Sequence, residues 1–374
     1  MKAQPRFALS MPWRRATAVF LIDVAVLAIA SHCPDAWQKN HAAWWVGVGV
    51  AAVITIATLV TARGIPLAWI PVARVRNWYA NPKALLEACT QPIDHQRRFG
   101  RDVVGIREYG GRLVTVIAVD GIAGAAAGRH HQEGTPDDAL PIEAVAAALR
   151  QFDVRLDGVD IVSVATQSDD STWLVLRMDP QHNVAAVAAR DSLAATFVAA
   201  TERLAHDIDG QHCHARPLNA AEIADMDDAV LAGLDVDRIR PHWRHLEHPD
   251  GCVTSAWVSP RDITGTLLDE LQVPEADVTM LTIRLVNRFG RIDVSAFVRY
   301  HSKDRLPKSL LRGLSRLTGR QLGAVRASLP APATGRPLLM SSRGLNEDEH
   351  ILIRLGEAAA ATPAYSPDLA RMAR

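Results

Sequence analysis

The sequence lacks the short motifs that most nucleotide-binding and hydrolytic enzymes carry. Phosphate-binding loops place glycine amides against the phosphate and add a lysine or a metal ion to neutralise its charge. Neither GxxxxGKS, GxxxxGKT nor GxGxxG occurs among the 374 residues. A GxSxG elbow, an HExxH pair and a DxDxDG calcium loop are also absent. The sequence therefore gives little support to an ATPase or to these classes of hydrolase.

The sequence is also poor in cysteine and aromatic residues and has no excess of either charge. Its four cysteines, Cys33, Cys89, Cys213 and Cys252, form no CxxC pair, so neither a disulfide framework nor a paired zinc site is indicated. The 41 basic and 41 acidic residues balance, which argues against nucleic acid as a partner and favours proteins or lipid. Because aromatic residues make up only 5% of the chain, we expect cores of small aliphatic side chains.

Two apolar runs near the start predict a two-helix transmembrane hairpin. They extend from Ala16 to Ala30 and from Ala42 to Ala62. A helix needs about 20 apolar residues to cross the hydrocarbon core, and the second run provides that length without a charge. The first run is shorter and contains Asp23, but a helix that also includes residues 11–13 would be long enough to cross the membrane. Both runs therefore qualify as spans.

Positive charges around the two runs predict the orientation of the hairpin, because lysine and arginine near membrane ends are retained in the cytoplasm. The connection between the runs has Lys39 as its only lysine or arginine. The flanks are richer: Lys2, Arg6, Arg14 and Arg15 precede the hairpin, and Arg63, Arg74, Arg76 and Lys83 follow it. We therefore expect a multi-pass protein of the inner (plasma) membrane, with both termini and the large domain in the cytoplasm. Alternatively, the first run is a cleaved secretory signal ending at Ala28-Ile29-Ala30, and the second run returns the chain to the cytoplasm.

Three residues of the hairpin are candidate contacts between transmembrane helices. An ionised carboxylate at mid-span costs about 2.5 to 3.5 kcal/mol unless it is paired or faces protein, so Asp23 needs compensation. A partner-helix Arg, Lys or Thr, protonation, or a proton pathway could each supply it, and we favour a buried contact between helices. Gly47 and Ala51 form a small-xxx-small pair that permits close helix approach, although an alanine-rich chain also contains such pairs by chance.

The remaining chain predicts an α+β fold preceded by an interfacial segment. Residues 64–79 mix tryptophan, proline and arginine, which is typical of a chain at the head-group boundary. The diglycine Gly110-Gly111 between alternating runs over 103–109 and 112–119 predicts a β-hairpin, because both glycines tolerate positive φ. Residues 121–141 lack a period and predict a mobile loop.

The order of expected elements recurs and suggests two related βαββα halves within an α/β-type domain. After the first hairpin we expect a helix over 142–152, strands over 159–166 and 172–178, and a helix over 183–207. In the second half we expect a strand over 252–258, a helix over 260–271, strands over 278–286 and 292–300, and a helix over 306–329, with a helix over 218–234 between the halves. The chain then divides into transmembrane helices with a collar (1–80), two cytosolic α+β halves (81–210 and 211–335) and a C-terminal tail (336–374).

Histidine and aspartate clusters are the candidate metal ligands. The histidines are His130-His131, the pair flanking Cys213, and His242, His245 and His248 at spacings of three. Prolines bracket the last group, so we favour solvated or locally hydrogen-bonded histidines and expect no metal or other cofactor. Acidic groups at Asp235 and Asp237, and at Asp225, Asp227 and Asp228, could hold a divalent cation beneath a nucleotide sugar, but short acidic clusters more often face water on a helix.

Four stretches of the chain resemble a known family. They are His214 to Ile223, Gly233-Leu234, Pro241 to Arg244, and Ser255 to Thr264, and the two spans and the region from Arg101 to Gly121 fit the same family. They resemble EccE, a membrane component of the mycobacterial type VII (ESX) secretion system. The resemblance implies a structural subunit of an inner-membrane complex that also contains EccB, EccC and EccD, with EccC as the motor ATPase.

The most family-like stretch also has a reading from residue chemistry alone. Trp257 lies in a strand that ends at Val258-Ser259-Pro260, Ser259 can cap a helix opened by Pro260, and Asp262 lies near the positive end of that helix. We therefore predict that these residues mark the end of a strand and the start of a helix and have no catalytic role, and we assign no catalytic residues. The leading hypothesis is a non-enzymatic assembly subunit. The alternative is a membrane-tethered transferase of the nucleotide-sugar type that uses Asp235 and Asp237.

Overall fold

The computed structural model describes the helical hairpin and most of the domain that follows it. The described residues are 7–9, 13–32, 42–62, 65–86, 90–97, 100, 102–121, 139–149, 154–166, 170–188, 192–209, 213–264, 271, 273, 275–288, 290–307, 309–311, 313–331, 338, 340–346, 349 and 351–355. The expected mobile loop over 121–141 falls almost entirely outside these residues, as does the end of the tail.

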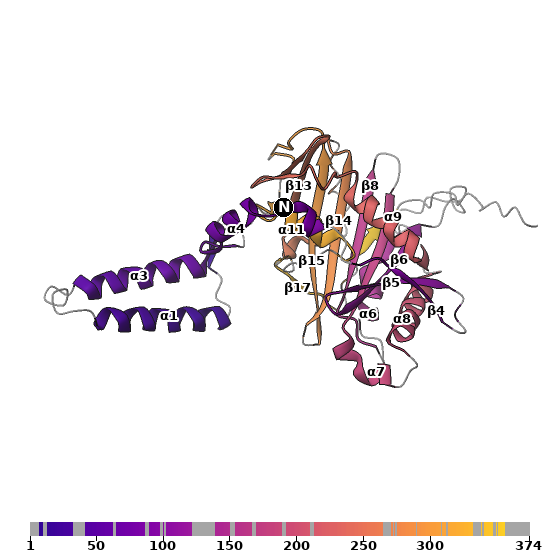
Figure 1. The fold of residues 1–374 in the computed structure, drawn as a ribbon, viewed down its shortest axis with the longest axis horizontal. Helices are drawn as coiled ribbons and strands as arrows, with labels where there is room; N and C mark the ends of the chain where they lie inside the picture. Colours follow the sequence, from indigo (N-terminus) through magenta and orange to yellow (C-terminus); the bar gives the residue numbers. More distant parts are fainter. Residues whose placement is uncertain are drawn as a thin grey trace, which may run out of the picture.

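The two apolar runs form helices α1 (Trp13–Ser31) and α3 (Ala42–Leu59), which pack against each other and project away from the sheet domain (Figure 1). Among the described helices, α3 alone is long and apolar enough to cross a membrane, because the apolar part of α1 is shorter. The second helix ends at Leu59, earlier than expected, since the chain then turns into a small antiparallel sheet. That sheet consists of β1 (Phe7–Leu9), β2 (Val60–Ala62) and β3 (Ile65–Pro66).

Helix α4 (Trp69–Trp78) connects the hairpin to the sheet domain and presents an apolar stripe. Trp69, Val72, Val75 and Trp78 recur at every third position, and about half or more of each side chain is exposed. Exposed tryptophan and valine on one helix stripe suit the boundary between acyl chains and head groups. The placement of this segment at a membrane surface stays a prediction.

The domain is built on one large antiparallel sheet, which agrees with the expected α+β class. Its main strand order is β11-β12-β13-β15-β14-β8-β9-β6-β5-β4, while β10 pairs with β6, β16 with β13 and β17 with β15. The strands are β4 (Ile93–Gln96), β5 (Val103–Tyr109), β6 (Arg112–Gly121), β8 (Gly158–Thr166), β9 (Asp170–Met178), β10 (Cys213–Pro217), β11 (Arg240–Pro241), β12 (Leu246–His248), β13 (Gly251–Trp257), β14 (Val278–Arg288), β15 (Arg291–Ser302), β16 (Ser315–Arg316) and β17 (Arg343–Gly344). A separate pair joins β7 (Ala139–Pro141) to β18 (Leu352–Arg354).

Helices cover both faces of this sheet, so its strands are buried on two sides. On one face, α6 (Ile142–Ala148) and α8 (Leu193–Ile208) pack over aliphatic strand residues. On the other face lie α5 (Pro82–Leu86), α9 (Ala220–Leu231) and α11 (Gln321–Ser328). Few aromatic rings enter either layer, as the composition predicts. Phe197, Phe297 and Tyr300 are fully buried, and Trp257 is 2% exposed.

The expected hairpins and the helix between the halves are confirmed. Gly110 and Gly111 have φ of 56° and 77°, the left-handed values that a two-residue hairpin turn between β5 and β6 requires. The pairs β8–β9 and β14–β15 form as expected. Helix α9 begins with a capping box, in which Asn219 accepts from the Glu222 amide and Glu222 accepts from the Asn219 amide.

Three expected helices are wrong in extent. The helix over 183–207 is interrupted, because η1 (Pro180–Asn183) and α7 (Val184–Ala188) precede α8, which starts afresh at the Ser192 cap. The helix over 260–271 is only the single turn η2 (Pro260–Asp262) in the described residues. Arg343 donates to the carbonyls of Pro260 and Ile263, which are thereby engaged outside any helical ladder. The helix over 306–329 starts only at Gln321, because β16 first pairs with β13.

Strand order repeats along the chain. The first series is β4, β5, β6, α6, β8, β9, β10 and α9, with β7, η1, α7 and α8 as additional elements that have no counterpart among the described elements of the second, which is β11, β12, β13, η2, β14, β15, β16 and α11. In the first series, β6 pairs with β5 along its first part and with β10 along its second part. In the second series, β13 pairs in the same way with β12 and then with β16. The segment after the third strand packs on the α6 face, and the last helix packs on the opposite face.

The central pair β8–β14 joins the two series symmetrically. Val162 pairs with Thr282, and the flanking pairs are Asp160 with Arg284 and Met280 with Val164. A two-fold rotation through the Val162–Thr282 pair therefore exchanges the flanking pairs and the two hairpins. The sheet order on either side, β8-β9-β6 and β14-β15-β13, follows the same relation.

A buried charge cluster lies at this junction. Asp160 is 1% exposed and accepts hydrogen bonds from Arg177 Nη2 at 2.6 Å and from Arg284 Nη2 at 2.8 Å. Arg284 also donates to the Ala327 carbonyl of α11. Burial alone would raise the pKa of Asp160, but the two guanidinium groups lower it to about 2. The cluster thus links three central strands and one covering helix.

We predict that Asp160→Asn destabilises the protein by about 3 to 5 kcal/mol, because it leaves two largely buried guanidinium groups without a counter-charge. Thermal unfolding of the full chain in detergent measures this, with exposed Asp225→Asn as the matched control, expected within about 0.5 kcal/mol of the natural chain. Since the pKa of Asp160 is lowered on folding, its contribution is present above about pH 4 and is lost as the pH falls toward 2. Asp160→Asn should therefore flatten the pH dependence in that window; an unchanged pH profile would contradict the assignment.

Candidate functional site

The interface between α1 and α3 contains the small residues expected to mediate helix contact. The buried residues of α3 are Ala43, Gly47 and Ala51, spaced by four so that they share one face. A Cβ added to Gly47 would lie 2.6 Å from the Cβ of Ala30 on α1, which is closer than two carbons can approach. The helices therefore meet at Gly47 because it lacks a side chain, which is the packing that small-xxx-small pairs permit.

Asp23 on α1 lies opposite the next position of the same α3 face. Thr55 Oγ1 donates a hydrogen bond of 2.6 Å to Asp23 Oδ2. The other carboxyl oxygen, Oδ1, is buried and has no hydrogen-bond partner among the described residues. A threonine of the partner helix is one of the compensating groups that the sequence allowed, although Thr55 itself carries no motif that would have identified it.

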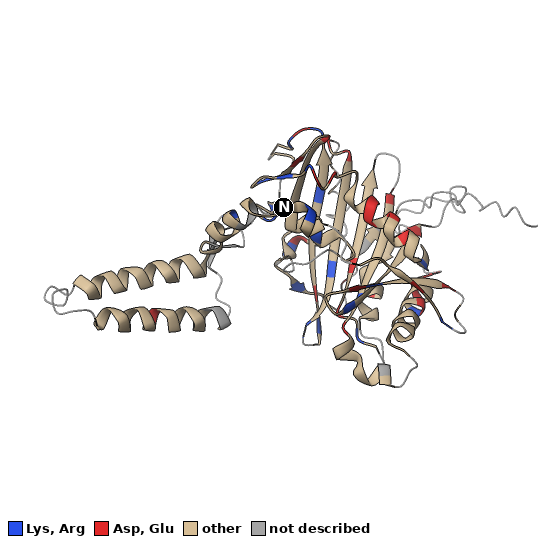
Figure 2. Ribbon diagram, viewed as in Figure 1, with Lys and Arg blue, Asp and Glu red and all other residues tan. Residues whose placement is uncertain are grey.

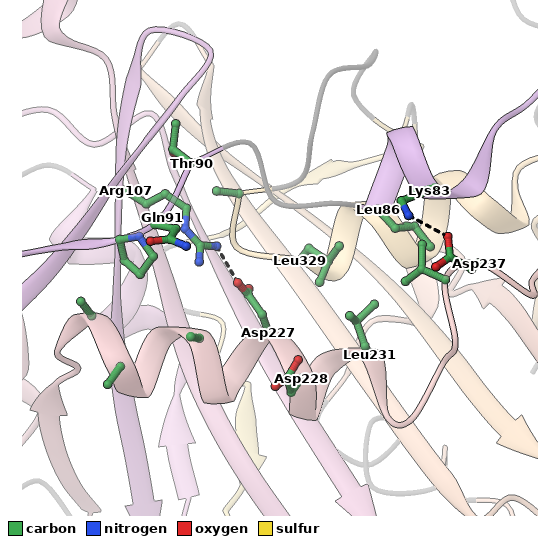
Figure 3. Close-up of a pocket in the computed structure, with 16 residues that line it drawn as sticks. Lys83, Leu86, Thr90, Gln91, Arg107, Asp227, Asp228, Leu231, Asp237 and Leu329 are labelled. Atoms are coloured by element: carbon green, nitrogen blue, oxygen red, sulfur yellow. Dashed lines mark ion pairs between the residues drawn. The ribbon is translucent and has the colours of Figure 1, made fainter.

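A cavity of about 720 Å³ lies between α5, the segment before β4, Arg107 of β5, and α9 (Figure 3). Its wall on α9 consists of small residues, Ala220, Ala221 and Ala224, and Leu86 and Leu329 contribute apolar side chains from α5 and from the end of α11. Three of the aspartates considered as cation ligands, Asp227, Asp228 and Asp237, also line it. The fold therefore brings together acidic residues that are ten positions apart in the sequence.

Two of these carboxylates are already paired with cationic side chains, as the dashed lines of Figure 3 show. Arg107 Nη1 lies 2.7 Å from Asp227 Oδ2, and Lys83 Nζ lies 3.1 Å from Asp237 Oδ1. Burial raises the pKa of the Asp227 carboxyl above its usual value, and the Arg107 charge offsets this only in part. A divalent cation would have to displace both partners to use these oxygens.

The other acidic residues of the two clusters lie outside this cavity's lining. Asp235 pairs with Arg238 at 3.3 Å, and both side chains are well exposed. Asp225 is exposed on α9. Sequence reasoning missed Arg107, which is 3% exposed and pairs with Asp227 in the cavity. A lone arginine in a β-strand gives no signal of burial.

The candidate histidines separate in space. His242 and His245 lie together in the turn between β11 and β12, while His248 falls on the opposite face of β12 from Glu247. Burial, followed by the nearby Arg305 charge, lowers the pKa of His245. His214 is exposed and lies 3.3 Å from Asp209. His130, His131 and His212 lie outside the described residues.

The stretch from Trp257 to Asp262 runs from the core to a partly exposed turn, because η2 contains no buried residue. Trp257 is 2% exposed and packs with Phe297. Pro260 occupies the first position of η2, with Asp262 at its end. The expected helix cap at Ser259 is wrong, because its side chain makes no capping hydrogen bond and no α-helix follows in the described residues.

Comparison with known proteins agrees with the resemblance seen in the sequence. A family model for EccE, described as a type VII ESX secretion system translocon, matches residues 166–258. The chain is 52% identical over 395 aligned residues to ESX-5 secretion system protein EccE5 of Mycobacterium tuberculosis (strain ATCC 25618 / H37Rv). It is 51% identical over 391 residues to ESX-5 secretion system protein EccE5 of Mycobacterium marinum (strain ATCC BAA-535 / M). Each alignment covers 96% of this chain and 97% of the relative.

An apolar helical hairpin joined to a large sheet domain, together with these matches, defines a membrane component of a protein secretion system. The chain belongs to the EccE family of the ESX type VII secretion system. The resemblance read from the four sequence stretches is thereby confirmed.

We predict that Gly47→Val separates α1 from α3, whereas Gly49→Val does not. A side chain at Gly47 collides with Ala30, while a Cβ at Gly49 meets no atom within 4 Å. Overpacking of this kind costs about 1 to 3 kcal/mol. Thermal melting of each full-length variant in detergent measures the difference. Equal melting temperatures for the two variants would show that the observed helix contact does not form.

Proposed function

We propose that this chain is a non-catalytic structural subunit of the membrane complex of an ESX-5-type secretion system. The supporting observation is near full-length identity of about half to two EccE5 proteins, shared across both the hairpin and the sheet domain. On this proposal, the hairpin holds the chain in the inner membrane and the sheet domain stabilises the assembly beside it. EccB, EccC and EccD are the proposed neighbours, with EccC supplying the ATPase.

The proposed topology places both termini and the sheet domain in the cytoplasm. The support is the distribution of lysine and arginine, which favours the two flanks of the hairpin over its connection. In Figure 2, the described parts of α1 and α3 are almost entirely tan, whereas the domain beyond α4 carries both charges throughout. A hairpin with few charged residues followed by a charged domain is the pattern of a lipid-embedded anchor with a water-exposed domain.

The Asp23–Thr55 hydrogen bond and the Gly47–Ala51 face are proposed to hold the hairpin together from within. Because the hydrogen bond and the small-residue face both lie between α1 and α3, only the outward faces of the two helices can contact lipid or partner helices. Those faces carry large apolar side chains, among them Phe20 and Ile29 on α1 and Trp45 and Val53 on α3, each more than half exposed. Partner helices would therefore meet aliphatic and aromatic surface rather than the small-residue stripe.

We also propose that the sheet domain is an internal duplication, with a boundary later than the sequence suggested. The support is the repeated strand order and the symmetric register about Val162 and Thr282. In this division β10 and α9 belong to the first repeat, because β16 and α11 occupy the matching places in the second. The junction then lies between α9 and β11 rather than near residue 210.

The membrane-tethered transferase is the weaker alternative. It needs free carboxylates for a metal–nucleotide complex, yet Asp227 and Asp237 are paired with Arg107 and Lys83. We predict that calorimetry of the full chain with manganese and nucleotide sugars at millimolar concentration gives no binding heat. Saturable binding that Asp237→Asn removes would favour the transferase.

Assembly is the property that tests the proposed function. We expect the full chain, extracted from a mycobacterial host in mild detergent, to migrate in a large complex with the other membrane subunits. Native gels and mass measurement of the purified complex provide the readout. We further expect Gly47→Val to reduce the amount of complex more than Gly49→Val, because only the first disturbs the hairpin. A free monomer, in cells whose other subunits assemble normally, would contradict the proposal.

A further inference from the structure

The turn between β11 and β12 gathers two imidazoles and a carboxylate. One ligand atom each from His242, His245 and Glu247 lies within 4.8 Å of the others. The two rings are nearly parallel, with centroids 4.7 Å apart and an interplanar angle of 16°. His242 Nε2 lies 2.9 Å from Glu247 Oε2. Among the described residues, no other histidine that the sequence analysis named lies in a group of three potential metal ligands.

Backbone contacts hold this turn in shape. The His242 amide donates to the His245 carbonyl at 3.0 Å, which closes the turn. The neighbouring Trp243 carbonyl accepts from the Gly319 amide at 2.7 Å, which fixes the turn to the segment before α11. Glu247 is paired directly across the strands with Cys252 of β13, so the thiol and the carboxylate share one face of the sheet. Cys252 therefore lies beside Glu247, outside the group of three ligand atoms that lie within 4.8 Å of one another.

We propose that His242, His245 and Glu247 bind one borderline transition-metal ion of the zinc class, with Cys252 or water as the fourth ligand. Imidazole, carboxylate and thiolate are the groups that Zn²⁺ selects. His245 Nε2 is buried and has no hydrogen-bond partner among the described residues, so its donor atom is available. Zinc ligands in a tetrahedral site are about 3.3 Å apart. Because a ring nitrogen binds a metal in the plane of its ring, the stacked rings cannot share one ion as they stand, and binding requires the partly exposed His242 ring to turn.

A metal ion can bind at this turn only if the nearby Arg305 side chain moves away from Glu247. Arg305 Nη2 lies 3.6 Å from Glu247 Oε2, and a bound cation would have to displace it. The Arg305 side chain is 66% exposed, so it can move into water. Arg316 lines the same small cavity of about 380 Å³ and donates to the Leu306 carbonyl. Because like charges repel, removing Arg305 should strengthen a cation site and weaken an anion site.

A second group of potential ligands lacks this availability. Asp157, Asp179 and His182 also lie within 4.8 Å of one another. Arg112 Nε lies 3.1 Å from Asp157 and 3.8 Å from Asp179, and Asp179 Oδ1 accepts from the Gln181 amide as the cap of η1. That cluster is explained by an ion pair and a helix cap. The turn at His242 therefore carries the proposal by itself.

The test is metal titration of the full chain in detergent, purified with a tag that contains no histidine and treated first with a chelator. Calorimetry with Zn²⁺ and visible absorption with Co²⁺ should each show one ion per chain. We expect His245→Ala to abolish binding. Glu247→Gln, which retains shape and hydrogen bonding, should weaken it about ten-fold or more. Arg305→Gln should tighten it, and a thiolate charge-transfer band lost in Cys252→Ser would identify the fourth ligand.

His248→Ala is the matched control, because it removes a histidine three residues away on the other face of β12. It should bind zinc like the natural chain, and all variants should elute and melt as folded protein. The proposal is overturned if the natural chain binds no more zinc than His245→Ala, or if Arg305→Gln weakens binding. It is also overturned if inorganic phosphate, rather than zinc, binds at this turn and Arg305→Gln abolishes that binding. Because this inference concerns a site remote from the hairpin, its failure would leave the assembly proposal intact.

Discussion

The apolar surface of α1 and α3 is the constraint from which the rest of the account follows. Large side chains such as Phe20, Trp45 and Val53 lie exposed on the hairpin, and water would oppose their exposure by about 25 cal/mol for each Å². The two helices bury only a narrow stripe against each other, so lipid or partner helices must cover the remainder. The Thr55 hydroxyl satisfies one oxygen of Asp23, which makes its presence between the helices tolerable.

In the sheet domain, charged side chains connect secondary-structure elements to one another. Asp160 joins β8 to β9 and β14 through two arginines, and Arg343 links β17 to the turn after β13 through Pro260 and Ile263. In the cavity beside α9, Arg107 is paired with Asp227 and Lys83 with Asp237. A domain in which buried ion pairs hold strands and helices together is suited to scaffolding. His245 Nε2 is one of several buried side-chain atoms that have no hydrogen-bond partner among the described residues, together with both ring nitrogens of His301.

Local signals in the sequence predicted the hairpins and the apolar helices well. Glycine pairs with positive φ and alternating strands depend on neighbours in the chain, and these appeared where expected. The helices over 183–207 and 306–329 were overextended, because a cap at Ser192 and the pairing of β16 with β13 outweighed helical periodicity. The contacts of the candidate site were harder to predict from the sequence than the fold. Thr55 and Arg107 gain their roles from partners 32 and 120 positions away, and no local pattern encodes such contacts.

The central claim, that a membrane hairpin leaves the sheet domain on the cytoplasmic side, is tested most directly by thiol accessibility. One single-cysteine variant would retain Cys33 in the connection between the helices, and another would carry Val184→Cys at an exposed position of α7. A membrane-impermeant maleimide should label Cys33 in cells stripped of their outer layers, and should label the α7 cysteine only in inverted vesicles. Labelling of the α7 cysteine from outside would contradict the account.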